Sequence, residues 1–240
     1  IIEDRTIAIV QNTLHDGWPI PIGEEWQGFT PTLADIDNDG NSEIIIKSFS
    51  TVYAYDGDGK LIWKRQILSG WYAFSNGPMS TTSVADINND GNQEIIVGIN
   101  CVYILDHTGN IINILPNNCP NNNDEEKNNI PFWQSTMTLV DLDDDDKLEI
   151  IAPWGTSFTS KIFVWKSDGT NYKNWPQDIQ NDDNGGNFII PSVVVGDIDK
   201  DNDLELVAYY MDLKKYGGTF DSSSSPSYIY AWKSDCKLED

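Results

Sequence analysis

Short apolar runs alternate with polar turns along the whole chain. The runs are rich in Val, Ile, Tyr and Trp, as in Thr51-Val-Tyr-Ala-Tyr55 and Lys161-Ile-Phe-Val-Trp165, and this composition is typical of β-strands. No segment shows the sustained 3.6-residue periodicity of an amphipathic helix. The pattern therefore predicts an all-β protein with little helix.

The apolar runs recur in a fixed order. A first run (30–34, 81–85, 136–140 and 191–196) leads into a polar loop. A second run (44–46, 95–97, 150–152 and 206–208) follows the loop, and a third run (51–55, 101–105, 161–165 and 228–232) ends in a turn rich in Asp and Gly. A fourth run follows that turn, as at 61–65 and 111–115. Four antiparallel strands in a repeat of about 50 residues are typical of one β-propeller blade.

The repeats divide the chain into a partial unit at about 1–29 and four fuller units at about 30–80, 81–135, 136–190 and 191–240. In the partial unit, Thr6–Val10 resembles the third run, and Asp16-Gly-Trp-Pro19 matches Lys173-Asn-Trp-Pro176. We therefore expect a β-propeller of four-stranded antiparallel blades, with four full repeats plus a partial N-terminal one, as a single domain or arc over 1–240. Either the N-terminal strands close a small ring with the last unit, or the chain is an arc of a larger propeller.

The polar loop is nine residues long and begins at Asp35, Asp86, Asp141 and Asp197. Oxygen-bearing side chains stand at positions 1, 3, 5 and 9 of every copy, and position 2 is always Ile or Leu. A tight loop with carboxylates at alternate positions turns several oxygens toward one centre, and Ca²⁺ takes six to eight oxygens in irregular geometry. Each loop therefore predicts one calcium site, which makes about four ions in all.

Position 7 is expected to bind through its backbone carbonyl, because one copy carries Lys there. The predicted ligands, at positions 1, 3, 5, 7 and 9 of the four loops, are Asp35, Asp37, Asp39, Asn41, Glu43, Asp86, Asn88, Asp90, Asn92, Glu94, Asp141, Asp143, Asp145, Lys147, Glu149, Asp197, Asp199, Asp201, Asp203 and Glu205. Loop two carries Asn88 at position 3 and is expected to be among the weaker sites. The pattern argues against an EF-hand, which needs flanking helices and Glu at position 12, where these loops have Ile46, Val97, Pro153 and Ala208.

Position 6 needs a residue that tolerates a left-handed backbone. Gly40 and Gly91 stand there in the first two loops, and Asp146 and Asn202 replace them in the last two. Asp and Asn adopt that backbone more readily than other non-glycine residues. Position 4, which is Asp144 in the third loop, is expected to point outward.

The net charge of −23 excludes nucleic acid and anionic membranes as partners, because both need basic surfaces. The loops hold 18 of the 38 acidic residues, so they account for nearly half of the negative charge. No apolar run reaches the ~18 residues of a membrane span, and no signal peptide is visible. Because the sequence begins with Ile rather than Met, a mature or trimmed product is expected.

Three cysteines allow at most one internal disulfide. Cys101 lies in a strand-like run and is expected to be a small buried apolar residue, whereas a bond between Cys119 and Cys236 is left open. Trp63, Trp165 and Trp232, with Tyr55, recur at equivalent places and are expected in the core. Six further tryptophans lie near turns and would suit sugar stacking if several shared one rim: Trp18, Trp26, Trp71, Trp133, Trp154 and Trp175.

The repeats resemble the FG-GAP/VCBS family, the β-propeller repeats of integrin α-subunits and of many microbial surface proteins. The residues that carry this resemblance are Leu33-Ala-Asp-Ile-Asp-Asn-Asp-Gly-Asn-Ser-Glu-Ile-Ile-Ile46 and its three counterparts, with the Gly17-Trp18-Pro19 type of turn. The resemblance implies a calcium-stabilised propeller whose ions lie in the loop between the first two strands of each blade, with positions 1, 3, 5, 7 and 9 as ligands. No Phe-Gly precedes the loops and no Gly-Ala-Pro follows them, which departs from the name-giving pattern.

The expected function is that of an extracellular or cell-surface interaction or adhesion module with a protein or glycan ligand and structural calcium. The alternatives are a lectin-like propeller or polysaccharide lyase, and a scaffold arc of a larger assembly that binds nothing itself. No Gly-x-Ser-x-Gly, P-loop or His-Glu-x-x-His motif is present, and the two histidines, His15 and His107, lie in turn contexts. We therefore expect no enzymatic activity.

Overall fold

The computed structural model describes residues 15, 17–22, 30–48, 51–67, 81–99, 101–117, 136–155, 160–179, 187–189, 192–213, 215–216, 219–220 and 227–235. These residues form strands, turns and loops, and none of them lies in a helix. The expected all-β class is therefore confirmed. None of the described residues forms a helix long and apolar enough to cross a membrane.

The strands form four antiparallel sheets, each built around one acidic loop, and we call each sheet with its loop a unit. Unit one contains β1 (Thr32–Ala34), β2 (Glu43–Lys47), β3 (Thr51–Tyr55) and β4 (Leu61–Gln66). Unit two contains β5 (Ser83–Ala85), β6 (Glu94–Gly98), β7 (Val102–Leu105) and β8 (Ile111–Leu115). Unit three contains β9 (Thr138–Val140), β10 (Glu149–Gly155), β11 (Ser160–Trp165) and β12 (Gln177–Ile179). In these three units the strands pair in chain order, as the repeat predicts.

Unit four departs from this order. It contains β13 (Asn187–Ile189), β14 (Val193–Gly196), β15 (Glu205–Leu213) and β18 (Ser227–Lys233), and both β13 and β14 pair with β15 along the same edge. A separate hairpin joins β16 (Lys215–Tyr216) to β17 (Thr219–Phe220). Among the described residues no strand follows β18, so the described part of the unit fills three strand positions.

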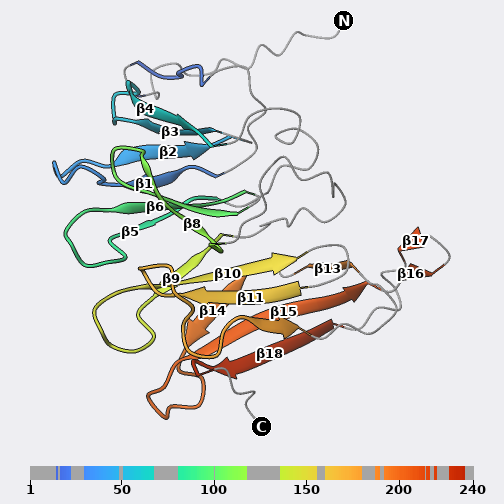
Figure 1. Ribbon diagram of the computed structural model, residues 1–240. Coiled ribbons are helices and arrows are strands. Elements are labelled where there is room, and N and C mark those ends of the chain that lie inside the picture. The colour runs from blue at the N-terminus through green and yellow to red at the C-terminus, as the bar shows by residue number, and fades with distance from the viewer. Residues whose placement is uncertain are drawn as a thin grey trace, which may run out of the picture.

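The four sheets stack in chain order, with unit one at one end and unit four at the other (Figure 1). Three apolar clusters lie between successive units. Between units one and two, for example, Ile45 and Val52 pack against Ile95 and Tyr103. Alternate side chains of each sheet therefore face the preceding and the following unit, as period-2 strands require.

Polar contacts repeat between the units as well. The hydroxyls of Thr32, Ser83 and Thr138 donate to carbonyls of the next unit, those of Thr82, Met137 and Val193. The indole of Trp63 donates to the carbonyl of His107 at 3.0 Å, and that of Trp175 donates to the carbonyl of Ser234 at 3.1 Å. The same face of each unit thus meets the next in the same way.

The tryptophans expected in the core lie there. Trp165 and Trp232 are buried, Tyr55 is buried, and Trp63 packs against the cluster between units one and two. These rings recur because each third or fourth strand closes the same inter-unit core. Trp175 is also buried, 6.2 Å from Trp232 between ring centroids.

Cys101 corrects the cysteine prediction. It is fully buried, as expected, but it is disulfide-bonded rather than free, and its partner lies outside the described residues. Because the sequence has three cysteines, this bond rules out the pairing of Cys119 with Cys236. The apolar run around Cys101 hid this role, since burial alone does not distinguish a thiol from a disulfide.

Candidate metal centre

The first residue of each acidic loop organises the backbone around its carboxylate. The amides of Asp39 and Gly40 donate to Asp35 at 3.1 and 3.0 Å, and the amides of Asp90 and Gly91 donate to Asp86 at 3.0 and 2.7 Å. The carboxylates of Asp141 and Asp197 accept from the equivalent stretches, through the amides of Asp143, Asp145 and Asp146 and those of Lys200 and Asn202. Position 1 therefore closes the turn in all four copies.

Two positions of each loop have a left-handed backbone. Position 6 has φ of 91° at Gly40, 90° at Gly91, 64° at Asp146 and 73° at Asn202, which confirms the predicted turn. Position 4 has φ of 60° at Asn38, 58° at Asn89, 57° at Asp144 and 67° at Lys200. The bend at position 4 was not predicted, although Asn or Asp at that position of three copies was a signal for it.

Position 9 brings a buried carboxylate back to the start of the loop. Glu43, Glu94, Glu149 and Glu205 each begin the second strand of a unit and are all buried. One oxygen of each accepts the backbone amide of position 2, at 2.9, 3.1, 2.8 and 2.9 Å in loop order. In loop four the second oxygen, Oε1 of Glu205, is buried without a hydrogen-bond partner.

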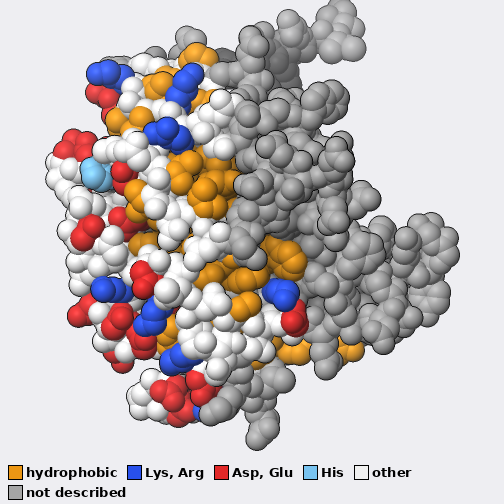
Figure 2. All heavy atoms as spheres, in the orientation of Figure 1, with side chains coloured by type: hydrophobic (Ala, Val, Ile, Leu, Met, Phe, Trp, Pro, Cys, Tyr) orange, Lys and Arg blue, Asp and Glu red, His pale blue; other side chains and the backbone are white. Residues whose placement is uncertain are grey.

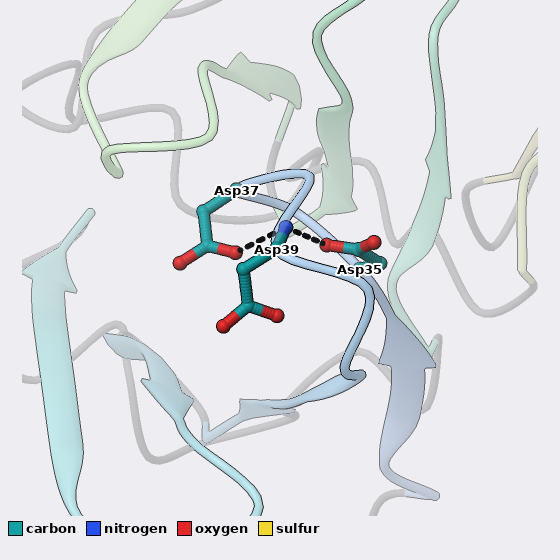
Figure 3. A group of neighbouring side chains, drawn as sticks. All are labelled: Asp35, Asp37 and Asp39. Atoms are coloured by element: carbon teal, nitrogen blue, oxygen red, sulfur yellow. Dashed lines mark hydrogen bonds between the residues drawn. The ribbon is translucent and has the colours of Figure 1, made fainter.

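Three loops bring ligand atoms together within 4.8 Å of one another. The groups are Asp35 with Asp37 and Asp39, Asp141 with Asp143 and Glu149, and Asp197 with Asp199 and Glu205. Figure 3 shows the carboxylates of Asp35 and Asp37 on either side of the amide of Asp39, which donates to both. Positions 1 and 3 thus meet in each of these loops, together with position 5 in loop one and position 9 in loops three and four.

The remaining predicted ligands lie in the same loops but outside these groups. At position 7, Asn41, Asn92, Lys147 and Asp203 have exposed side chains, which fits a role for their backbone only. At position 5, the carboxylates of Asp90, Asp145 and Asp201 each accept the amide two residues later, at 2.9, 3.0 and 2.8 Å. Asp39, which belongs to the loop-one group, accepts the equivalent amide at 2.7 Å. Equivalent positions of the four loops therefore make equivalent contacts, but the oxygen atoms of the predicted ligands do not all meet at one point.

Two oxygen atoms in the loops are buried without a hydrogen-bond partner. They are Oε1 of Glu205, in loop four, and Oδ1 of Asn88, at position 3 of loop two. A buried polar atom without a partner costs about 1–3 kcal/mol. Both atoms belong to predicted ligand positions, and both are oxygens, the donor type that Ca²⁺ prefers. The residues present therefore fit a bound cation.

Burial and neighbouring charges raise the pKa of the Glu43, Glu94 and Glu149 carboxyls. Burial raises the pKa of Glu94 and of Glu149 to about 7, and neighbouring aspartates of the same loops act in the same direction. The pKa of Glu43 is raised as well, first by burial and then by the charges of Asp37 and Asp39. A divalent cation would favour the ionised form of each.

Two lysines reach into the last two loops. Lys166 Nζ lies 3.0 Å from Asp143 Oδ2 and 3.8 Å from Asp145 Oδ2, and Lys233 Nζ lies 3.1 Å from Asp201 Oδ2. In unit three Ile150, which follows Glu149, pairs with Trp165, and Lys166 comes next in the chain. In unit four Leu206, which follows Glu205, pairs with Trp232, and Lys233 comes next. The equivalent residues of units one and two are Asp56 and Asp106. A lysine therefore stands beside loops three and four, and an aspartate stands at the same place beside loops one and two. This difference in charge was not predicted from the sequence.

The loops are also joined to the packing between units. Position 2, whose amide the glutamate holds, buries its side chain against the following unit at Ile36, Ile87 and Leu142. Asn38 Nδ2 donates to the carbonyl of Gly91 at 2.9 Å, and the amide of Leu148 donates to the carbonyl of Ile87 at 2.9 Å. The loops lie along one side of the stack, where acidic side chains gather (Figures 1 and 2).

The tryptophans near turns do not form one aromatic rim in the described part of the chain. Trp175 is buried, and Trp154 packs edge-on against Phe163 at 6.2 Å between centroids. Trp18 lies against the turn at Gly59, where a Cβ would be 3.5 Å from its ring. Trp26, Trp71 and Trp133 lie outside the described residues. Of the three described members of this set, Trp175 is therefore buried, and Trp18 and Trp154 are half-buried.

No protein-family profile matches the sequence, and no curated protein matches it. Among solved structures, an exotype rhamnogalacturonan lyase is 13% identical with a TM-score of 0.49, over 89% of this chain and 57% of that chain. A protein of unknown function from Bacteroides caccae is 11% identical with a TM-score of 0.35, over 77% of this chain and 56% of that chain. The chain thus spans little more than half the length of either protein. Likenesses at these scores carry no argument about its function.

Proposed function

We propose that this chain is a calcium-stabilised β-propeller, or an arc of one, of the FG-GAP/VCBS type, with one calcium ion in each acidic loop. The observation that carries this proposal is the carboxylate of Glu205. One of its oxygens holds the amide of Ile198, while the other is buried without a hydrogen-bond partner. Ligand atoms of Asp197 and Asp199 lie within 4.8 Å. A cation bound here would satisfy the buried oxygen and offset the repulsion among the three acids.

The role of the ion in this proposal is structural. The carboxylate at position 9 would bind the ion with one oxygen while the other accepts the amide of position 2. In the first three copies the side chain at position 2 is buried between units. Filling the loop would therefore fix the corner at which one unit meets the next. Each bound ion stabilises the folded chain according to its affinity and concentration, by about 2.7 kcal/mol at one hundred times Kd.

The proposed setting is extracellular or the cell surface, where the chain acts as an interaction or adhesion module. Loops of this open, partly solvated kind suit the millimolar calcium found outside cells. The disulfide at Cys101 favours an oxidising compartment, because disulfides persist there. With a net charge of −23, the partner is expected to be a protein or a glycan rather than nucleic acid.

Equilibrium dialysis against calcium, with magnesium as the matched cation, tests the metal proposal. We expect about four calcium ions per chain, with weaker binding in loop two and little displacement by an equal concentration of magnesium, which dehydrates reluctantly. Binding of less than one ion per chain would contradict the proposal. Glu205→Ala should remove one ion from the count while the other loops still fill.

The interaction role is tested on its own. The calcium-loaded protein would be applied to a glycan array and to intact cells, in millimolar calcium and in EDTA. Calcium-dependent binding to either surface supports the proposal, and saccharide release with unsaturated ends would instead show a lyase. Binding to neither surface, by a protein that still takes up calcium, would leave the metal proposal standing and overturn the adhesion role.

A further inference from the structure

The outer face of unit four is built like a face that the other units bury. We call the face that a unit turns toward the following unit its C-side face, and the opposite face its N-side face. In units one to three the C-side face carries Ile36, Ile87 and Leu142 at loop position 2, which are 2%, 1% and 8% exposed. The equivalent residue of unit four, Ile198, is 57% exposed.

The third strand shows the same contrast. Val52, Val102 and Ile162 occupy equivalent positions in the third strands of units one to three. Each pairs with the residue four places after the position-9 glutamate, and all three are 0% exposed. Ile229 holds that position in unit four and is 76% exposed. Exposed apolar residues occur singly on most surfaces, but several at the buried positions of a repeat mark an interface.

The first strand completes the contrast. In units one to three this strand offers a hydroxyl that donates to the next unit, from Thr32, Ser83 and Thr138. The equivalent residue of unit four is Val194, which has no hydroxyl and is 61% exposed. Unit four therefore presents an apolar first strand, apolar loop residue and apolar third strand on one face.

The complementary surface lies at the other end of the same chain. On the N-side face of unit one, Leu33 is 66% exposed, whereas its equivalents Val84, Leu139 and Val195 are half-buried and pack on the preceding unit. Ile44 and Ile46 lie beside it and are half-buried. This face matches those that receive the C-side faces of units one to three.

The outer part of that receiving face is already occupied by the chain itself. A Cβ at Gly59 would lie 2.8 Å from Ile20 and 3.5 Å from Trp18, just as a Cβ at Gly109 would lie 2.7 Å from Trp63 of the fourth strand of unit one. Trp18 and Ile20 thus occupy the place of a fourth strand in front of unit one. Unit four, in its described residues, has the first three strand positions and no fourth. The two ends therefore supply complementary parts of one unit.

We propose that the C-side face of unit four docks on the N-side face of unit one in a second copy of this chain. Ile198, Val194 and Ile229 of one copy would cover Leu33, Ile44 and Ile46 of the other, and Trp18 and Ile20 of the second copy would stand in the fourth-strand place beside β18. Such a contact is head to tail, so two copies joined at both ends form a closed ring with no exposed end. The contact continues the packing that already joins the four units.

Sedimentation velocity on the whole chain tests this arrangement with two complementary variants. The wild type should sediment at twice the mass of one chain. Ile229→Asp should block docking through the C-side face of unit four, and Leu33→Asp should block docking through the N-side face of unit one. Each variant alone should therefore be a monomer. A buried unpaired carboxylate should raise the Kd of the contact at least about a hundredfold. An equimolar mixture of the two should regain a dimer, because one intact junction remains between them. Circular dichroism and melting of each variant establish that it is folded.

Ile112→Asp is the matched control, because Ile112 is an exposed isoleucine of β8 away from both faces, and this variant should associate like the wild type. A monomeric wild type overturns the proposal. It is also overturned if both variants still dimerise, or if two folded monomeric variants fail to associate when mixed. A monomer whose Leu33→Cys and Ile229→Cys form an internal disulfide would show instead that one chain closes on itself.

Discussion

Glu205 Oε2 accepts the backbone amide of Ile198 at 2.9 Å, while Oε1 of the same carboxylate is buried without a hydrogen-bond partner. Both oxygens are needed if the residue is to hold the loop and bind an ion. An amide offers one acceptor oxygen and cannot do both. This makes Glu205 the sharpest place to separate loop closure from metal binding.

Glu205→Gln should weaken calcium binding in loop four by at least about tenfold, since hydrogen bonds and contacts to a charged group are worth about 1.5–3 kcal/mol. Titration calorimetry of the variant should show one weaker site among unchanged ones. Asp203→Asn, at position 7, is the control, because its side chain is exposed and its backbone is the expected ligand. Equal affinities for Glu205→Gln and the wild type would contradict the assignment of position 9.

Lys166 should compete with the proposed ion in loop three. Its ammonium lies 3.0 Å from Asp143 and 3.8 Å from Asp145, so Lys166→Met removes a cation that must move aside when calcium binds. A partly exposed pair of this kind is worth about 0.2–1 kcal/mol, and the variant should therefore bind calcium a few-fold more tightly. The calcium-free variant should be less stable by a similar amount.

Lys161→Met is the matched control for that change, because Lys161 pairs with Asp178 at 2.8 Å and contacts none of the predicted ligands. It should leave calcium affinity unchanged. A loss of affinity in Lys166→Met would mean that the lysine supports the site rather than competing with it.

Positions 1 and 4 of loop three distinguish the register of the loop. Asp141 accepts amides of Asp143, Asp145 and Asp146, whereas Asp144 is exposed with φ of 57°. Asp141→Ala should cost about 2–3 kcal/mol of stability through lost charged hydrogen bonds and lost calcium. Asp144→Asn keeps a residue that tolerates this backbone and should be nearly neutral. Urea denaturation in calcium measures both, and equal losses would show that the register is wrong.

The fold of the loops and the strand order of units one to three follow from the sequence, because both repeat. Each loop lies between two apolar runs of fixed spacing, so the carboxylate at position 9 had to begin the second strand. The lysines at 166 and 233 were not found, because they come near the loops through the pairing of the second and third strands. The register of strand pairing could have revealed them. Each lysine follows Trp165 or Trp232, which pairs with the residue after the position-9 glutamate.

Other features depend on small energies that composition does not reveal. Lys200 holds a left-handed backbone with φ of 67°, where propensity favours Asn, because the loop around it imposes the turn. Lys47 is buried and donates to the carbonyl of Gly98 at 3.1 Å, and burial lowers its pKa to about 7. Ring closure depends on the rotation between successive units, which no local pattern encodes.

The stability of the calcium-free protein should fall as pH rises from about 4.5 to about 7. Glu94 and Glu149 have folded pKa values of about 7, raised by burial from an ordinary value of 4.5. Between those values the folded chain retains protons that the unfolded chain has released, so the free energy of unfolding falls with rising pH and levels off above about 7. Calcium would bind the ionised carboxylates, so its stabilising effect should grow across the same interval.

Urea denaturation at pH 5, 6, 7 and 8, in EDTA and in calcium, measures this dependence. Glu149→Gln should flatten part of the slope in EDTA, which separates the contribution of this glutamate from the general repulsion of an acidic protein. A calcium-free protein whose stability rises from pH 5 to pH 7 would contradict the assigned pKa shifts.

The most direct test of structural calcium is the melting temperature of the whole chain in EDTA and in excess calcium. With several loops each contributing up to about 2.7 kcal/mol at one hundred times Kd, and about 2–4 °C per kcal/mol for a chain of this size, calcium should raise the melting temperature by at least about 10 °C. Magnesium at the same concentration should raise it far less. An unchanged melting temperature in EDTA, together with no heat of calcium binding, would contradict the account.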